Sequence, residues 1–225
     1  MAQTTSESEL LIRIGRAMEQ ERFTEAQLIA AELTDAPSSP RVRLLAADRL
    51  LRSGDAKAAV EQFDIYADLR PEQGPYLWQR GIALYFVGRF EDGVEQFKIH
   101  REVNSKDVEN AAWHFLCLAK LKSPEKARQL VLPAPDDPRP TMKEVLEMLR
   151  TGNTSNVSDR MKECEGQPDE GVAAFYGNFY LGLHADALGQ RKEATKFMGR
   201  AAAKAPMGYM GDIARVYLEF LESQT

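Results

Sequence analysis

One 34-residue pattern occurs twice between residues 40 and 107, and it constrains the fold more than any single residue does. The first copy contains Ala59-Val60-Glu61-Gln62-Phe63, and Gly93-Val94-Glu95-Gln96-Phe97 follows 34 residues later. The same offset relates Gly54 to Gly88. A fixed period of this length is typical of stacked helical repeats, which bury their apolar faces only against neighbouring copies. The sequence therefore predicts an all-α solenoid of antiparallel helix pairs.

The apolar spacing and the helix-breaking residues divide the rest of the chain. The predicted N-terminal repeats cover about 7–39, 40–73, 74–107 and 108–132. Residues 133–140 contain four prolines, so we expect a rigid, non-helical interruption there. Residues 141–225 are predicted to be helical, with one further pair at about 171–204. A last helix at 209–222 is expected to cover the open end of the solenoid.

Several local signals support these boundaries. Ser39-Pro40 is typical of a helix start, and Thr141-Met142-Lys143-Glu144 has the pattern of a capping box. Small residues at Ala47 and Gly81 would let paired helices approach closely. Phe63 and Phe97 are then expected to fill the space against the next repeat.

Composition argues against two classes of partner. The net charge is −5 and the sequence pI is about 5.4, whereas sequence-independent binding to nucleic acid needs a basic surface. The longest apolar stretch runs from Gly81 to Gly88, and a membrane-spanning helix needs about 20 such residues. We therefore expect neither nucleic-acid binding nor membrane insertion.

The first residues bear on the location of the protein. Met1 to Glu7 contain neither a basic head nor an apolar core, so a signal peptide is not predicted and the chain reads as cytoplasmic. The alternative is an exported or periplasmic protein whose signal has been removed. Cys117 and Cys164 are interpreted as small buried thiols, and a disulfide between them would require export.

The sequence offers little catalytic chemistry. Only three histidines occur, and a metal site made from His100, His114 and Cys117 would lack a fourth ligand with conventional spacing. The chain contains no phosphate-binding glycine loop and no GxSxG or HExxH motif. We therefore expect no metal, no cofactor and no enzyme activity.

The order small residue, turn glycine, small residue, aromatic residue and Pro71 resembles the tetratricopeptide repeat, most clearly over residues 40–107. Tyr76-Leu77-Trp78-Gln79-Arg80-Gly81 and the run from Asn110 to Cys117 resemble a narrower group of bacterial lipoprotein-type and plastid-lumen repeat proteins, over residues 74–220. That group has no established catalytic site, and its lipoprotein members look like adaptors. The resemblance implies a protein-binding scaffold. The chain lacks the lipobox of those lipoproteins and the Lys/Asn set with which chaperone-binding repeats hold a C-terminal carboxylate.

In the tetratricopeptide pattern the first helix of each pair lines a concave groove. For this chain the pattern predicts a groove floor of Trp78, Ile82, Tyr85 and Phe86, with a charged rim of Arg41, Asp48, Arg52 and Arg80. Such a groove would bind a peptide or a helix of a partner. The same spacing also fits a stripe buried inside the stack. A further alternative is a structural protein whose exposed aromatic face forms a homodimer.

Overall fold

The computed structural model describes residues 6–20, 22–34 and 39–223. Residues 1–5, 21, 35–38 and 224–225 lie outside the described residues. The predicted boundary between the first two repeats, at about residue 39, therefore lies next to a range that is not described. The described residues form thirteen α-helices and one 3-10 helix, and no strand occurs among them, which confirms the all-α prediction. The elements are α1 Glu7–Glu19, α2 Phe23–Thr34, α3 Pro40–Arg52, α4 Ala56–Leu69, η1 Pro71–Tyr76, α5 Trp78–Phe86, α6 Phe90–Val103, α7 Val108–Leu121, α8 Pro124–Gln129, α9 Met142–Thr151, α10 Ser155–Glu163, α11 Glu170–Ala187, α12 Arg191–Ala203 and α13 Tyr209–Ser223.

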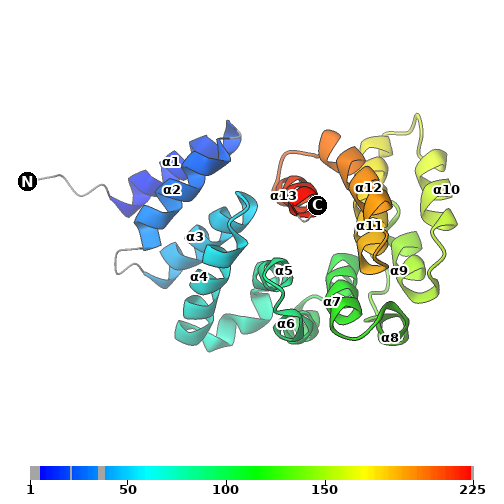
Figure 1. The fold of residues 1–225 in the computed structure, drawn as a ribbon, viewed down its shortest axis with the longest axis horizontal. Coiled ribbons are helices and arrows are strands. Elements are labelled where there is room, and N and C mark those ends of the chain that lie inside the picture. The colour runs from blue at the N-terminus through cyan, green and yellow to red at the C-terminus, as the bar shows by residue number, and fades with distance from the viewer. Residues whose placement is uncertain (1–5, 21, 35–38, 224–225) are drawn as a thin grey trace, which may run out of the picture.

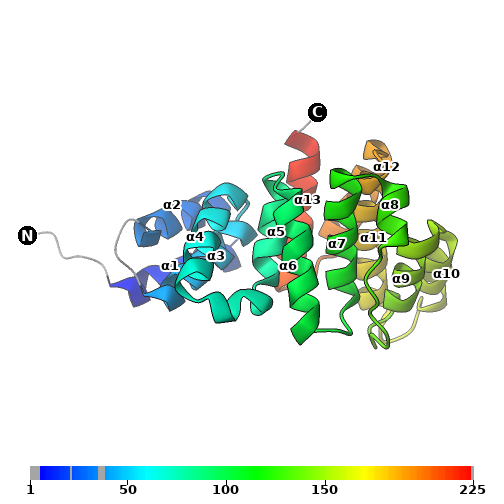
Figure 2. The same ribbon diagram turned by 90° about the horizontal axis from the view of Figure 1, so that it is seen from below.

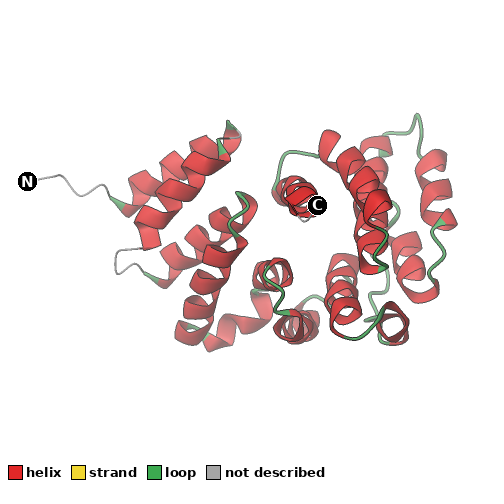
Figure 3. Ribbon diagram, viewed as in Figure 1, coloured by secondary structure: helices red, strands yellow, loops and turns green. Residues whose placement is uncertain are grey.

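The helices pack as sequential pairs. Helices α1 and α2, α3 and α4, α5 and α6, and α11 and α12 contact one another closely, and each pair is joined by a short connection. Figure 1 shows the pairs following an arc from the N-terminus to α12, and Figure 2 shows the same row from below. In Figure 3 most of the described loops are short segments between helices, and the longest of them, residues 130–141, joins α8 to α9. Within the described residues, no helix combines the length and the apolar character that crossing a bilayer requires.

Turn glycines explain how the two helices of a pair reverse direction. Gly54, Gly88 and Gly189 each have a positive φ, of +97°, +77° and +70°. This left-handed backbone region costs little for glycine but is strained for other residues. After the first of these turns, Asp55 accepts a hydrogen bond from the Ala58 N–H at 3.0 Å and so begins α4.

The small residues of the repeat allow close contact between paired helices. A Cβ atom added to Gly81 would lie 2.5 Å from Cζ of Phe97, so the ring of Phe97 lies directly against the backbone of α5. A Cβ at Gly93 would lie 2.7 Å from Sγ of Cys117 in the same way. Phe97 and its repeat counterpart Phe63 are both buried. The small residues of the repeat therefore mark the positions where a side chain of the neighbouring helix packs against the backbone.

Replacing Phe97 with alanine should lower the free energy of unfolding by about 3–5 kcal/mol, because the change leaves a cavity against Gly81 that the helices cannot fully close. Urea denaturation followed by far-UV circular dichroism measures the loss. A loss below about 1 kcal/mol would mean that the ring contributes little to packing between repeats.

Two local features differ from the sequence predictions. Residues 71–76 form a 3-10 helix, and α5 begins only at Trp78. Pro75 has no N–H to donate to the Pro71 carbonyl, so an α-helix cannot run through this segment. Thr141 has a left-handed backbone with φ +72°, and its hydroxyl donates to the Pro140 carbonyl. It therefore makes no side-chain cap, and the predicted capping box is wrong.

The last helix also occupies a position other than the expected one. Helix α13 packs against α12, as a helix at the end of the row would, but it also contacts α3 near the other end. Figure 1 shows α13 inside the arc rather than across its end. Side chains over about half of the circumference of α13 are buried, including Asp212, Val216, Ile213, Tyr217 and Ala214. The helix therefore belongs to the core of the molecule.

Candidate binding site on the inner side of the arc

Helix α13 covers most of the aromatic residues that the sequence placed in an open groove. Tyr217 stacks on Tyr85 with ring centroids 5.9 Å apart. Phe220 meets Phe86 edge to face at 5.3 Å. Tyr85 is almost completely buried as a result, and Phe86 is half-buried. These two rings contact the chain's own helix.

A buried polar cluster fixes α13 at this place. The hydroxyl oxygens of Tyr85 and Tyr217 each lie 2.7 Å from Oδ2 of Asp186 on α11, and they lie 2.8 Å from each other. Lys120 of α7 donates to Oδ1 of Asp186 at 3.2 Å. Burial raises the pKa of both tyrosines well above the ordinary value, so the hydroxyls stay protonated as donors. The cluster joins α5, α7, α11 and α13.

The predicted charged rim also takes part mainly in internal contacts. Arg52 donates through Nε to Oδ2 of Asp212 on α13 at 2.7 Å, and its guanidinium lies over the Tyr209 ring at 5.5 Å. Asp48 faces Arg52 at 3.6 Å, and burial raises the pKa of Asp48 despite the neighbouring arginines.

The other two rim residues lie away from α13. Arg80 donates to Asp64 of α4 at 2.8 Å and to Gln96 of α6 at 3.0 Å. Arg41 is exposed in the first turn of α3. The charges therefore do not form one rim. Arg52, which is paired with Asp48, holds α13, whereas Arg80 links neighbouring helix pairs.

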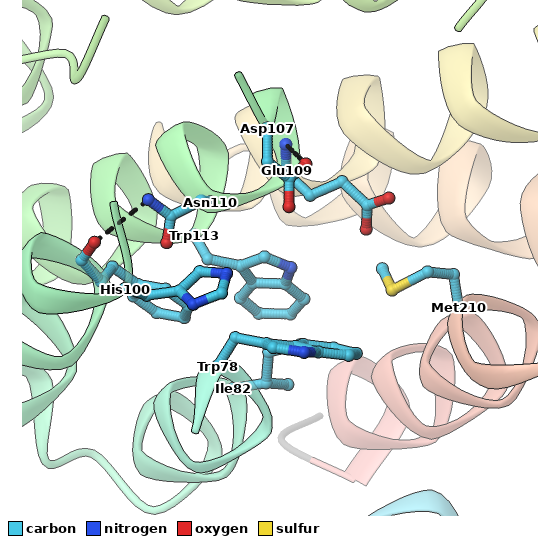
Figure 4. A pocket seen from close by; sticks show the side chains of 9 residues that line it. Trp78, Ile82, His100, Asp107, Glu109, Asn110, Trp113 and Met210 are labelled. Atoms are coloured by element: carbon cyan, nitrogen blue, oxygen red, sulfur yellow. Dashed lines mark hydrogen bonds between the residues drawn. The ribbon is translucent and has the colours of Figure 1, made fainter. Parts of the chain in front are cut away.

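A cavity remains beside the N-terminal end of α13. Its volume is about 110 Å³, and Figure 4 shows most of the side chains around it. The lining residues are Trp78, Ile82, Phe97, His100, Asp107, Glu109, Asn110, Trp113 and Met210. In Figure 4 the Trp78 ring lies below the Trp113 ring, with Glu109 above and Met210 to one side. We refer to this space as the tryptophan cavity.

Two polar atoms of the tryptophan cavity have no hydrogen-bond partner among the described residues. They are Nε1 of Trp113 and Oδ1 of Asn110, and both residues are more than nine-tenths buried. The other end of the Asn110 amide donates to the Phe97 carbonyl at 3.0 Å, which fixes how the amide is oriented. An unsatisfied buried donor or acceptor costs about 1–3 kcal/mol. These atoms indicate a site where a water molecule or a ligand makes hydrogen bonds.

Carboxylates gather at one wall of the cavity around a single guanidinium. Arg139, from the proline-rich segment, donates to Asp107 at 2.8 Å, to Asp137 at 2.6 Å and also to Glu109. Burial raises the pKa of Glu109 to about 7, although Arg139 acts in the opposite direction. Burial alone would raise the pKa of Asp137, but hydrogen bonds from Arg139 and the Val108 N–H lower it below its usual range.

The neighbours of Glu109 bear on the chemistry that the tryptophan cavity offers. A carboxyl group with a pKa near 7 in a cavity is a feature of acid–base catalysts. Glu109, however, is ion-paired to Arg139, and the His100 ring nitrogen Nδ1 lies 2.8 Å from the Pro75 carbonyl. No group of three or more metal-ligating side chains occurs in the part of the chain that the structure describes. Cys117 and Cys164 are both buried free thiols.

Sequence reasoning found part of this cavity and missed the rest. Trp78 and Ile82 were predicted from their place on the first helix of the third pair, and both line it. Trp113 and Asn110 lie on the first helix of the next pair, so the same rule would have included them. Met210 could not have been found in this way, because it comes from a helix more than 90 positions further along the chain.

No protein-family model matches the chain, and no curated protein matches it.

Proposed function

We propose that this protein is a non-catalytic, protein-binding scaffold built as a tetratricopeptide-type solenoid. The 34-residue period, the turn glycines and the packing of Phe97 on Gly81 support that architecture. In this proposal α13 is a fixed part of the scaffold. A side chain of a peptide or protein partner enters the tryptophan cavity.

The observation that carries the proposal is the tryptophan cavity itself. Two indole rings, a thioether and a few polar atoms surround a space that the folded chain leaves open beside α13. Hot spots of protein interfaces are enriched in tryptophan and take the form of pockets that desolvate an anchoring side chain. The Tyr209 ring of α13 packs edge to face on Trp78 at 4.6 Å, but Trp78 as a whole is only half-buried, which leaves part of the residue accessible to a partner.

The homodimer alternative depends on an exposed aromatic face. Tyr85 and Phe86 of that face pack against Tyr217 and Phe220 of the same chain. We therefore favour a heterologous partner and expect the free protein to be a monomer.

Replacing Trp78 with alanine should weaken the binding of peptide ligands by about 2 kcal/mol or more, because the change removes one of the two indole rings of the cavity. The ligands would be selected from a displayed random-peptide library on the immobilised protein. Their affinities for wild type and variant would then be measured by isothermal titration calorimetry.

Tyr76 provides a matched aromatic control, because its ring is exposed and does not line the tryptophan cavity. The Tyr76→Ala variant should keep its affinity, and thermal melts of both variants correct for the folded fraction. Peptides that bind wild type and Trp78→Ala equally would count against the proposal. A dimer in light scattering that dissociates in the Trp78→Ala variant would favour self-association instead.

A further inference from the structure

We infer that the tryptophan cavity accepts a planar organic cation, the guanidinium end of an arginine side chain supplied by the partner. This inference rests on the proposed function and names the chemistry of the anchoring side chain. It comes from three features of the cavity: its charge, its aromatic walls and its unpartnered polar atoms.

The charge around the cavity favours a cation. Asp107 and Glu109 line it, and Asp137 lies behind them, yet all three carboxylates share the guanidinium of Arg139. None of the lining residues is a lysine or an arginine. When all three carboxyl groups are ionised, the group carries two negative charges more than positive ones. A buried excess of negative charge is costly, and a second cation would offset it.

The walls of the cavity favour a flat cation. Figure 4 shows the Trp78 ring nearly edge-on, so that one face of the indole is directed toward the space below Trp113. A cation over an indole face is stabilised by about 0.5–2 kcal/mol, and tryptophan is the best such partner. A guanidinium is planar and more weakly hydrated than an ammonium group, so it stacks on an aromatic face at a lower desolvation cost.

The unpartnered polar atoms match the same ligand. Oδ1 of Asn110 and the carboxylate of Glu109 are acceptors, and a guanidinium presents five N–H donors in a fixed plane. The second unpartnered atom, Nε1 of Trp113, is a donor, so a guanidinium cannot satisfy it. It would donate to a water molecule or to a carbonyl oxygen of the same ligand. A carboxylate or phosphate ligand would meet Asp107 and Glu109 and be repelled. A neutral amide would fit the hydrogen bonds but leave the charge uncompensated.

The size of the cavity is consistent with this choice. A water molecule occupies about 30 Å³ in the liquid, so about 110 Å³ holds a few water-sized groups. A guanidinium has four non-hydrogen atoms.

The test compares two ligands of nearly equal shape, N-acetyl-arginine methylamide and the corresponding citrulline derivative, in which a neutral urea replaces the guanidinium. The chain contains two tryptophans, and both line the cavity, so fluorescence excited selectively at indole reports on this site. We expect a saturable change with the arginine derivative and binding at least about tenfold weaker with citrulline, a difference of about 1.4 kcal/mol. Equal binding of both ligands, or a response to neither, would overturn the inference.

A matched pair of variants assigns the effect to the carboxylate wall. Glu109→Gln should weaken the arginine derivative about tenfold or more and remove its preference over citrulline. Glu125→Gln, at an exposed position on α8, should leave the affinity unchanged.

Wild-type affinity for the cation should rise between pH 6 and 8, as Glu109 loses its proton. No rise over this range would contradict the role given to Glu109.

The experiments can distinguish a failure of the guanidinium assignment from a failure of the proposed peptide-binding function. Selected peptides that depend on Trp78 but lack arginine would keep the scaffold function and overturn the guanidinium assignment. Specific binding of the arginine derivative, with no peptide that depends on Trp78, would keep the cation site and overturn the peptide-binding proposal.

Discussion

Replacing Tyr217 with alanine is expected to lower the free energy of unfolding by about 4–8 kcal/mol. About 3–5 kcal/mol comes from the cavity left by a completely buried aromatic ring. A further 1–3 kcal/mol comes from the loss of the hydrogen bond to Asp186 in a buried position. Chemical denaturation monitored by circular dichroism measures the total. A change of this size is comparable with the whole stability of many domains, so the variant should be largely unfolded at 37 °C.

Tyr217→Phe separates the two contributions. It keeps the ring that stacks on Tyr85 but removes the hydroxyl that lies 2.7 Å from Asp186, so the expected loss is about 1–3 kcal/mol. If Tyr217→Ala instead cost less than about 2 kcal/mol, α13 would be a weakly held occupant of the arc. The aromatic residues beneath it would then be available to a partner helix, as the sequence first suggested.

The sequence predicted the parts of the fold that depend on local spacing. Helix pairs followed from the 34-residue period, and the reversals followed from Gly54 and Gly88, because both signals act between neighbouring elements. The position of α13 depends on how far the whole row of pairs curves. The contact that fixes it joins Tyr85 to Tyr217, residues 132 positions apart, and no local pattern encodes such a pairing.

In the candidate site, too, the sequence predicted the residues set by helical spacing but not those placed by long-range contacts. Trp78 and Ile82 were predicted because their helix faces the inner side of the arc, and this face is set by helical spacing. Arg139 was not predicted, because its role depends on where the proline-rich segment folds back. Its prolines indicated only that no helix would form there. The arrangement in which Arg139 joins Asp107 and Glu109 to Asp137 is therefore a product of tertiary structure.

Two buried histidines should make the protein sensitive to acid. His114 and His184 are buried, and burial lowers the pKa of each from 6.5 to about 4. Between pH 6.5 and 4 the unfolded chain therefore binds more protons than the folded chain at these positions, so stability falls as the pH falls. At about 1.4 kcal/mol per pKa unit, each histidine accounts for about 3 kcal/mol over this range. Glu109 acts in the opposite direction, because its raised pKa favours the folded chain as the pH falls from about 7 to 4.5.

Urea denaturation of wild type and His114→Leu at a series of pH values tests this account. Both ring nitrogens of His114 lack a partner among the described residues, so leucine leaves no polar group unpaired and should not destabilise the protein at pH 7.5. At pH 4 the variant should be more stable than wild type by about 3 kcal/mol. Glu109→Gln should lose stability more steeply than wild type as the pH falls, because it lacks the carboxyl group that gains a proton on folding. Parallel pH profiles for wild type and His114→Leu would show that His114 binds protons alike in the folded and the unfolded chain, and that burial does not lower its pKa.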